Sequence, residues 1–169
     1  MIKISVFILL FILTSCWPVS VSLIDKGSMP EEWKTFSVKT LNNKAPNAPL
    51  SYSPNLTEQI KDGIQNNTRL QLNTQSNKAE IIIEGSVNNY NLSPIALQEG
   101  DNAAKNRLTI STQFTIFIQK PEESIMKLTS TRFADYDSNT DLSSVENQLL
   151  DEINEQIVQD VINKLLSNW

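Results

Sequence analysis

The carboxylates of Asp135 and Asp137 have the spacing in this 169-residue sequence that comes nearest to a chemical site. Two acids one residue apart could bind a divalent cation or act as a carboxylate pair. They lie in the run Asp-Tyr-Asp-Ser-Asn, residues 135–139. Such residues also shape turns through hydrogen bonds between side chain and backbone. We expect that structural role, a turn between a strand and a helix, and predict no metal site.

Other kinds of catalytic site are excluded by composition. The sequence has no histidine, which rules out histidine triads and imidazole metal sites. Its four glycines are too scattered for a phosphate-binding loop. A hydrolase that uses carboxylates alone, such as Asp135 with Glu84, is a disfavoured alternative because nothing in the sequence pairs these acids. We therefore predict a protein that is not an enzyme, with no catalytic residues and no cofactor.

Cys16 is the only cysteine, and it follows an apolar run from Ile4 to Leu13. That run is typical of a secretory signal and is too short for a permanent membrane span. Leu13-Thr14-Ser15-Cys16 resembles the lipobox of bacterial lipoproteins, in which cleavage leaves a lipidated cysteine as the first residue. Each buried methylene of such a lipid contributes roughly 0.8 kcal/mol, so we expect attachment to a membrane. The alternative is an ordinary cleaved signal with a stray cysteine.

The expected organisation is a signal peptide (1–15), a lipidated N-terminus and tether (16–33), and one domain (34–169). The domain ends in a predicted helix, Leu142–Trp169, whose apolar residues recur at three- and four-residue spacing. Ser143 and Glu146 have capping-box spacing at its start. The chain has a net charge of −5, and six acidic residues lie from Asp141 onward. With no basic stripe elsewhere, we expect no nucleic-acid partner.

The remaining pattern predicts strands around a second helix, Asn55–Asn67, with Asn55 and Glu58 at capping-box spacing. The expected strands are Lys34–Leu41, a short one at Leu70–Leu72, Ala79–Leu92, Arg107–Gln119 and Ser124–Asp135. This order favours an α+β fold, a two-layer sandwich. Its mostly antiparallel or mixed sheet would have about four to five strands and carry both helices on one face.

The last predicted strand contains two competing alternations. Met126, Leu128 and Ala134 would face one side of the sheet, while Ile125 and Phe133 would face the other. Either set could be buried, because strand side chains alternate with a period of two. The sequence alone does not choose between them.

Several segments in a fixed order resemble the LptE-type lipoproteins of lipopolysaccharide assembly. They are Asn106–Ile110, Arg132–Asp137, Leu142–Glu146 and the Asn168–Trp169 end, with Ile81–Tyr90 and Pro94 fitting as well. The resemblance covers Thr35–Trp169. It implies a non-enzymatic outer-membrane lipoprotein, facing the periplasm or inside the lumen of its partner, an LptD-type β-barrel. It also implies that lipopolysaccharide is the ligand. The alternative is a lipoprotein that pilots or supports a different barrel or secretion channel.

An anionic glycolipid would be contacted by basic side chains. The candidate lipopolysaccharide-binding residues are Lys105, Arg107, Lys127 and Arg132. A hairpin closed near Lys120–Glu123 would bring Arg107 and Arg132 together on neighbouring strands. The alternative is structural: Arg107 would be a solvated edge charge, and Arg132 would pair with Asp135 or Asp137.

Overall fold

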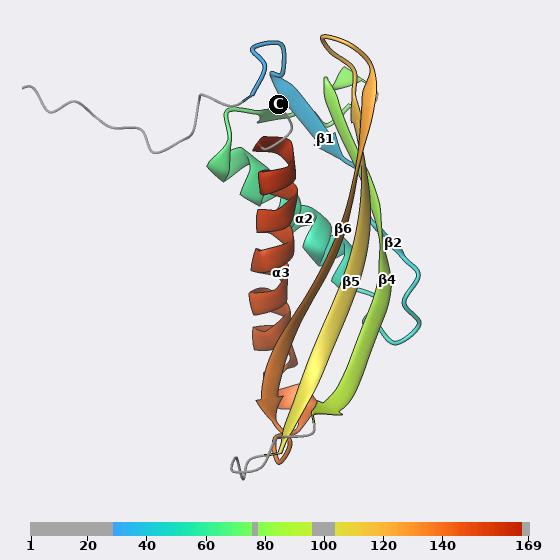
Figure 1. Cartoon of the computed structure of the whole chain (residues 1–169), viewed down its shortest axis with the longest axis vertical. Coiled ribbons are helices and arrows are strands. Elements are labelled where there is room, and N and C mark those ends of the chain that lie inside the picture. Colours follow the sequence, from blue (N-terminus) through green and yellow to red (C-terminus); the bar gives the residue numbers. More distant parts are fainter. Residues whose placement is uncertain (1–28, 76–77, 96–103, 167–169) are drawn as a thin grey trace, which may run out of the picture.

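Three long antiparallel strands form most of the sheet in the computed structural model, which describes residues 29–75, 78–95 and 104–166. They are β4 (Ile81–Ile95), β5 (Lys105–Ile118) and β6 (Ser124–Asp137). β5 lies between the other two and pairs with both along its whole length (Figure 1). The alternation of apolar and polar residues in β5 buries one of its faces from Leu108 to Ile118.

Three short strands extend the sheet beyond β4. β1 (Thr35–Val38) and β2 (Asn42–Asn43) both pair with β4 in parallel, and β3 (Gln71–Leu72) pairs with β1 in parallel. The described residues therefore form a mixed sheet of six strands, slightly more than the four to five expected. β2 was not predicted, because two polar residues carry no hydrophobic period.

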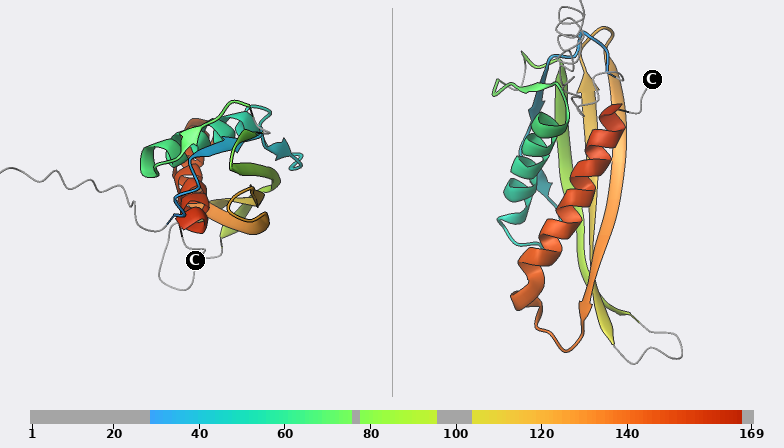
Figure 2. Two further views of the ribbon diagram at one scale, coloured as in Figure 1. Left: turned by 90° about the horizontal axis from the view of Figure 1, so that it is seen from above. Right: turned by 90° about the vertical axis from the view of Figure 1, so that its left-hand side faces the viewer.

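Two helices, α2 (Tyr52–Asn67) and α3 (Leu142–Leu166), lie on the same face of the sheet (Figure 2). The predicted α+β sandwich is therefore confirmed. The apolar stripe predicted for the last helix is also confirmed, since its central residues are buried: Leu149, Ile153, Ile157, Val161 and Leu165. The expected end of this helix at Trp169 lies outside the described residues.

Neither helix in the described part of the chain is long and apolar enough to cross a membrane.

Both predicted capping boxes are wrong. α2 begins three residues before Asn55, and its N-cap residue, Ser51, makes no side-chain capping hydrogen bond. At α3 the capping side chain is Asp141, whose Oδ1 accepts a 3.3 Å hydrogen bond from the Ser143 N–H. Glu146 is instead occupied by a hydrogen bond from the Tyr90 hydroxyl of β4. Capping-box spacing recurs by chance in a chain rich in Ser, Asn and Glu, which explains both errors.

The structure resolves the ambiguous strand. Met126 and Ala134 are 5% and 2% exposed and face the helices, while Ile125 is 60% exposed on the opposite face. The register explains this choice, because Met126 lies opposite Ile116 and Ala134 lies opposite Leu108. Both β5 residues belong to the buried face.

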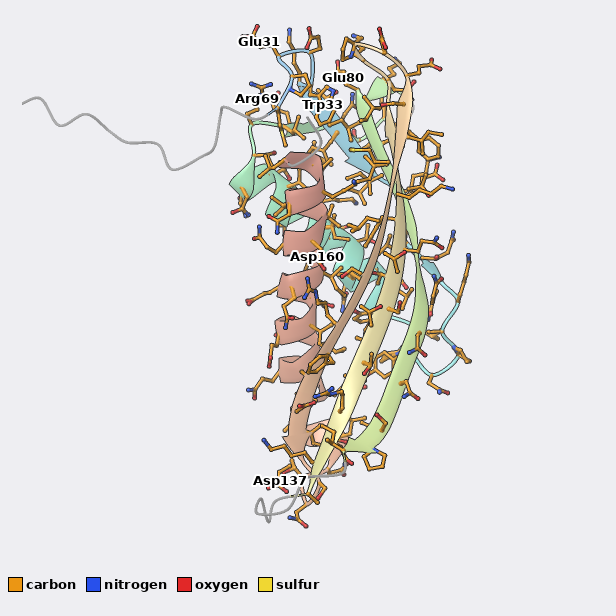
Figure 3. All side chains as sticks on the ribbon, viewed as in Figure 1. Glu31, Trp33, Arg69, Glu80, Asp137 and Asp160 are labelled. Carbon is orange, nitrogen blue, oxygen red and sulfur yellow. The ribbon has the colours of Figure 1, made fainter. Side chains whose placement is uncertain are left out.

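The packed core includes residues that precede residue 34. Met29 and Trp33, expected at the end of the tether, are buried in the core. The Trp33 indole N–H donates a 2.8 Å hydrogen bond to the Lys120 carbonyl, and the Arg69 guanidinium donates to the Met29 carbonyl at 2.8 Å. Figure 3 shows Trp33 and Arg69 at one end of the elongated molecule and Asp137 at the other.

Candidate functional site

The face of the sheet opposite the helices is not covered by another element in the described part of the chain. The register aligns its side chains in rows across β4, β5 and β6. Most of the middle rows carry hydroxyl or amide groups: Asn89, Asn91, Thr109, Ser111, Gln113, Thr129 and Thr131. We call this side the open face. Its middle can form many hydrogen bonds but is uncharged.

Arg107 and Asp135 form a paired row at one end of the open face. The Arg107 Nε and Nη2 atoms donate to the two carboxylate oxygens of Asp135 at 2.7 and 2.9 Å. The guanidinium also lies 3.6 Å from the ring centre of Phe133. The hydrogen bond from Arg107 lowers the pKa of Asp135. The alternative that Arg107 is a solvated edge charge is therefore wrong, because β5 is a central strand and both Nε and Nη2 of Arg107 are bound to Asp135.

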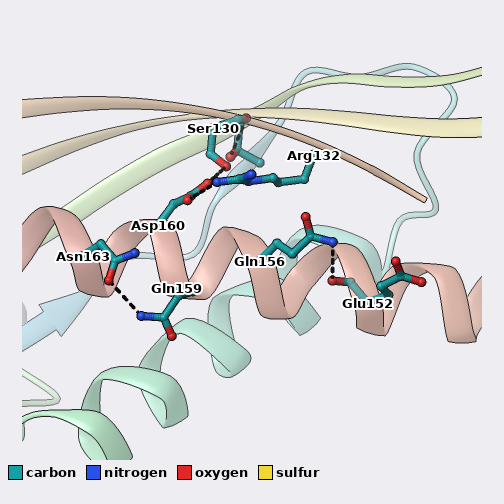
Figure 4. A network of polar contacts seen from close by, with 8 residues as sticks. Ser130, Arg132, Glu152, Gln156, Gln159, Asp160 and Asn163 are labelled. Carbon is teal, nitrogen blue, oxygen red and sulfur yellow. Dashed lines mark hydrogen bonds and ion pairs between the residues drawn. The ribbon is translucent and has the colours of Figure 1, made fainter.

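Arg132 lies on the other face, toward α3 (Figure 4). Its Nε donates to Asp160 Oδ2 at 2.8 Å, and the Ser130 hydroxyl donates to the same oxygen at 2.5 Å. Burial acts to raise the pKa of Asp160, but these hydrogen bonds outweigh it and the pKa is lowered.

Two expectations about Arg132 are corrected by this geometry. Its carboxylate partner is Asp160, not Asp135 or Asp137. The β5–β6 hairpin does form, yet it does not bring Arg132 to Arg107. Arg132 lies opposite Ile110, and its side chain is on the opposite face of the sheet from that of Arg107.

The remaining acids of the predicted sites have structural partners. Asp137 Oδ1 accepts a 2.8 Å hydrogen bond from the Asn139 N–H, so the predicted turn-shaping role is confirmed for Asp137. Glu84 pairs with Lys39 at 2.5 Å. Glu84 and Asp135 lie opposite Thr115 and Arg107, which are eight residues apart on β5.

That separation corresponds to about 27 Å, far beyond the roughly 5–9.5 Å of the carboxylate pairs used by hydrolases. The Asp135–Glu84 pair of the hydrolase alternative is therefore absent. Within the described residues, no group of three or more acidic, cysteine or histidine side chains has an arrangement suited to a metal ion.

Lys127 lies at the opposite end of the open face from Arg107. It borders a shallow depression of about 260 Å³ that Lys44, after β2, borders as well. Lys44 was not a predicted site residue, because nothing in the sequence places the loop after β2 near β6. Lys105 is exposed opposite Asp137, in the last row of the β5–β6 ladder.

The profile of the LptE family, described as lipopolysaccharide-assembly, matches residues 33–165. The chain belongs to the LptE family. No match was found among curated protein sequences.

Solved structures also resemble this LptE-family chain, including the following two. A hypothetical protein from Chlamydia trachomatis, CT253, has a TM-score of 0.54 at 10% identity, with 80% of this chain and 99% of that chain covered. The uncharacterized lipoprotein B from Nitrosomonas europaea has a TM-score of 0.51 at 14% identity, with 82% and 84% covered. At these identities the resemblance shows the fold alone.

The candidate ligand residues of this LptE-family chain are thus divided by the fold. Lys105, Arg107 and Lys127 share the open face, whereas Arg132 faces α3. Lys127 and Arg107 are themselves separated by eight residues along the ladder, about 27 Å. They do not form one cluster. The lipidation candidate, Cys16, lies outside the described residues.

Proposed function

We propose that the chain is an outer-membrane lipoprotein, lipidated on Cys16, that assists lipopolysaccharide assembly as the partner and plug of an LptD-type β-barrel. The observation that carries this proposal is the LptE-family match, which spans nearly the whole described domain. The lipobox around Cys16 supports the anchored state. In this role the chain binds and positions its partners and catalyses no reaction.

The open face supports the barrel partnership. The interior wall of an outer-membrane barrel is polar, and a sheet face rich in hydroxyl and amide groups can exchange hydrogen bonds with it. Asn91 and Thr131 lie in the middle of this face and are exposed. We therefore place the barrel contact on the open face, with the helices turned away from it.

A pull-down from detergent-solubilised membranes tests the proposal. We expect an LptD-type barrel to co-purify with the wild-type chain. Asn91→Arg combined with Thr131→Arg should abolish co-purification without lowering the thermal unfolding midpoint, because both side chains are exposed. Gln65→Arg with Gln148→Arg is the matched control on the exposed sides of the two helices.

Two results would contradict the proposal. A different channel in place of the LptD-type barrel would favour the alternative of a lipoprotein that pilots or supports another barrel. Loss of the barrel in the helix control, but not in the sheet variant, would place the contact on the helices instead.

A further inference from the structure

The depression on the open face is bordered by lysines from two separate parts of the chain. Lys44 follows β2, and its backbone N–H donates a 2.8 Å hydrogen bond to the Val87 carbonyl, which fixes this loop against β4. Lys127 belongs to β6, on the far side of β5. Three strand spacings separate β2 from β6, which is about 14 Å. The two lysines therefore stand on opposite sides of one hollow.

The surface between them is polar. Ser86 on β4 and Gln113 and Thr115 on β5 line the depression, together with Asn42 of β2. The Ser86 hydroxyl donates to Asn88 Oδ1 at 2.8 Å, which fixes its orientation. No aromatic or large aliphatic side chain takes part in the lining. The surroundings thus suit a hydrophilic ligand with hydrogen-bonding groups.

The charge of the depression is positive. Its single acidic residue, Glu84, is already paired with Lys39 at 2.5 Å. Lys44 and Lys127 have no ion pair among the described residues. Two uncompensated ammonium groups therefore face one hollow in a chain whose net charge is −5. Arg107, by contrast, is already bound to Asp135.

We propose that this depression binds a phosphate ester carried on a sugar. The two ammonium groups would contact the phosphate oxygens, and Asn42, Gln113 and Thr115 would hydrogen-bond the hydroxyls of the sugar. The site itself follows from charge and geometry. Lipopolysaccharide as the source of the phosphorylated sugar rests on the proposed function.

The first experiment titrates the full chain in detergent with N-acetylglucosamine 1-phosphate, followed by amide NMR. We expect saturable shifts around Asn42, Ser86, Gln113 and Thr115, and none with unphosphorylated N-acetylglucosamine. Lys44→Gln combined with Lys127→Gln should weaken binding at least tenfold.

The matched control is Lys34→Gln with Lys78→Gln, which removes the same charge from exposed lysines outside the depression. Equal weakening in this control would mean non-specific attraction and would overturn the site. The site would also be overturned if Lys105→Gln with Arg107→Gln abolished binding while the Lys44 and Lys127 variant bound normally.

A second experiment identifies the source of the phosphate. Binding of lipopolysaccharide and binding of phosphatidylglycerol vesicles are each measured for the wild-type chain and for the Lys44 and Lys127 variant. If the two lysines are needed for binding to lipopolysaccharide but not to the vesicles, lipopolysaccharide is supported as the source of the phosphate. Equal lysine-dependent binding to the vesicles would overturn that source in favour of phospholipid headgroups. Barrel co-purification is measured on the same variant. If the wild-type chain retains the barrel but does not bind the sugar phosphate, the site fails and the proposed function stands.

Discussion

The Tyr52 hydroxyl donates a 2.7 Å hydrogen bond to Asn154 Oδ1, joining α2 to α3 inside the core. Both residues are buried, with Tyr52 2% exposed and Asn154 3% exposed. The ring of Tyr52 also meets Tyr90 edge to face at 6.0 Å, and Tyr90 in turn donates to Glu146. Burial raises the pKa of Tyr52. Two hydrogen bonds and one aromatic contact thus link both helices to β4.

Tyr52→Phe should lower the free energy of unfolding by about 1–3 kcal/mol, because the Asn154 amide would remain buried with its acceptor unsatisfied. Chemical denaturation measures this change. Adding Asn154→Leu should cost less than the sum of the two single changes, since the orphaned amide is then removed. Additive losses would show that the hydrogen bond contributes nothing of its own.

Ile157→Ala should destabilise the fold by about 2–5 kcal/mol, because Ile157 is fully buried in the middle of α3. Thermal or denaturant unfolding checks the prediction. Glu155→Ala, an exposed position on the same helix, is the control and should change little. Equal small effects at the two positions would mean that this face of α3 is not packed against the sheet.

Gly63→Ala should destabilise the protein although alanine favours helices more strongly. A Cβ at Gly63 would lie 2.2 Å from Val158 Cγ1 on α3, so either the Val158 side chain or the two helices would have to shift. Overpacking of this kind costs about 1–3 kcal/mol, against a gain of up to about 1 kcal/mol in helix propensity. Val158→Ala in the same chain should recover much of the loss. A more stable Gly63→Ala variant would argue against close helix contact here.

Stability should fall in acid, because Asp135, Asp160 and Glu80 all have lowered pKa values. Hydrogen bonds from Arg107 and Thr35 are the main causes at Asp135 and Glu80. A lowered folded-state pKa contributes stability that is fully present above the ordinary values of 3.8 and 4.5 and is lost as pH falls through the folded-state pKa.

Thermal unfolding between pH 8 and pH 2 measures this loss. Asp160→Asn should be less stable than wild type at neutral pH and should lose less on acidification. Asp62→Asn, which removes a carboxylate without an ion pair among the described residues, should follow the wild-type curve. Because the chain has no histidine, we expect little change between pH 6 and pH 8. A steep loss in that window would contradict the prediction.

Cys16→Ala should leave the precursor unprocessed by the lipoprotein signal peptidase, or release a soluble periplasmic form. The reason is that the lipid chains attached to this cysteine supply the membrane attachment. Mass spectrometry of the native and variant proteins is the measurement. An unmodified Cys16 thiol in the native protein would contradict the lipoprotein proposal.

The sequence by itself determined the main elements and their buried sides where the period is strong. The stripe of α3 and the alternation of β5 could be read directly, because a continuous apolar face leaves one orientation that buries it. The α+β class followed from the order of these elements. The LptE resemblance also came from the order of segments in the sequence, without any knowledge of their contacts.

Only the tertiary structure decided which side chains meet. Arg132 is 28 residues from Asp160 and only three from Asp135, yet it pairs with Asp160. The reason is register: side chains alternate between faces, so neighbouring positions on β6 point to different partners. Lys44 and Lys127 border one depression for the same reason, since pairing of β2, β4, β5 and β6 brings them together. Sequence spacing carries no record of such distant pairings, and the candidate site depended on them.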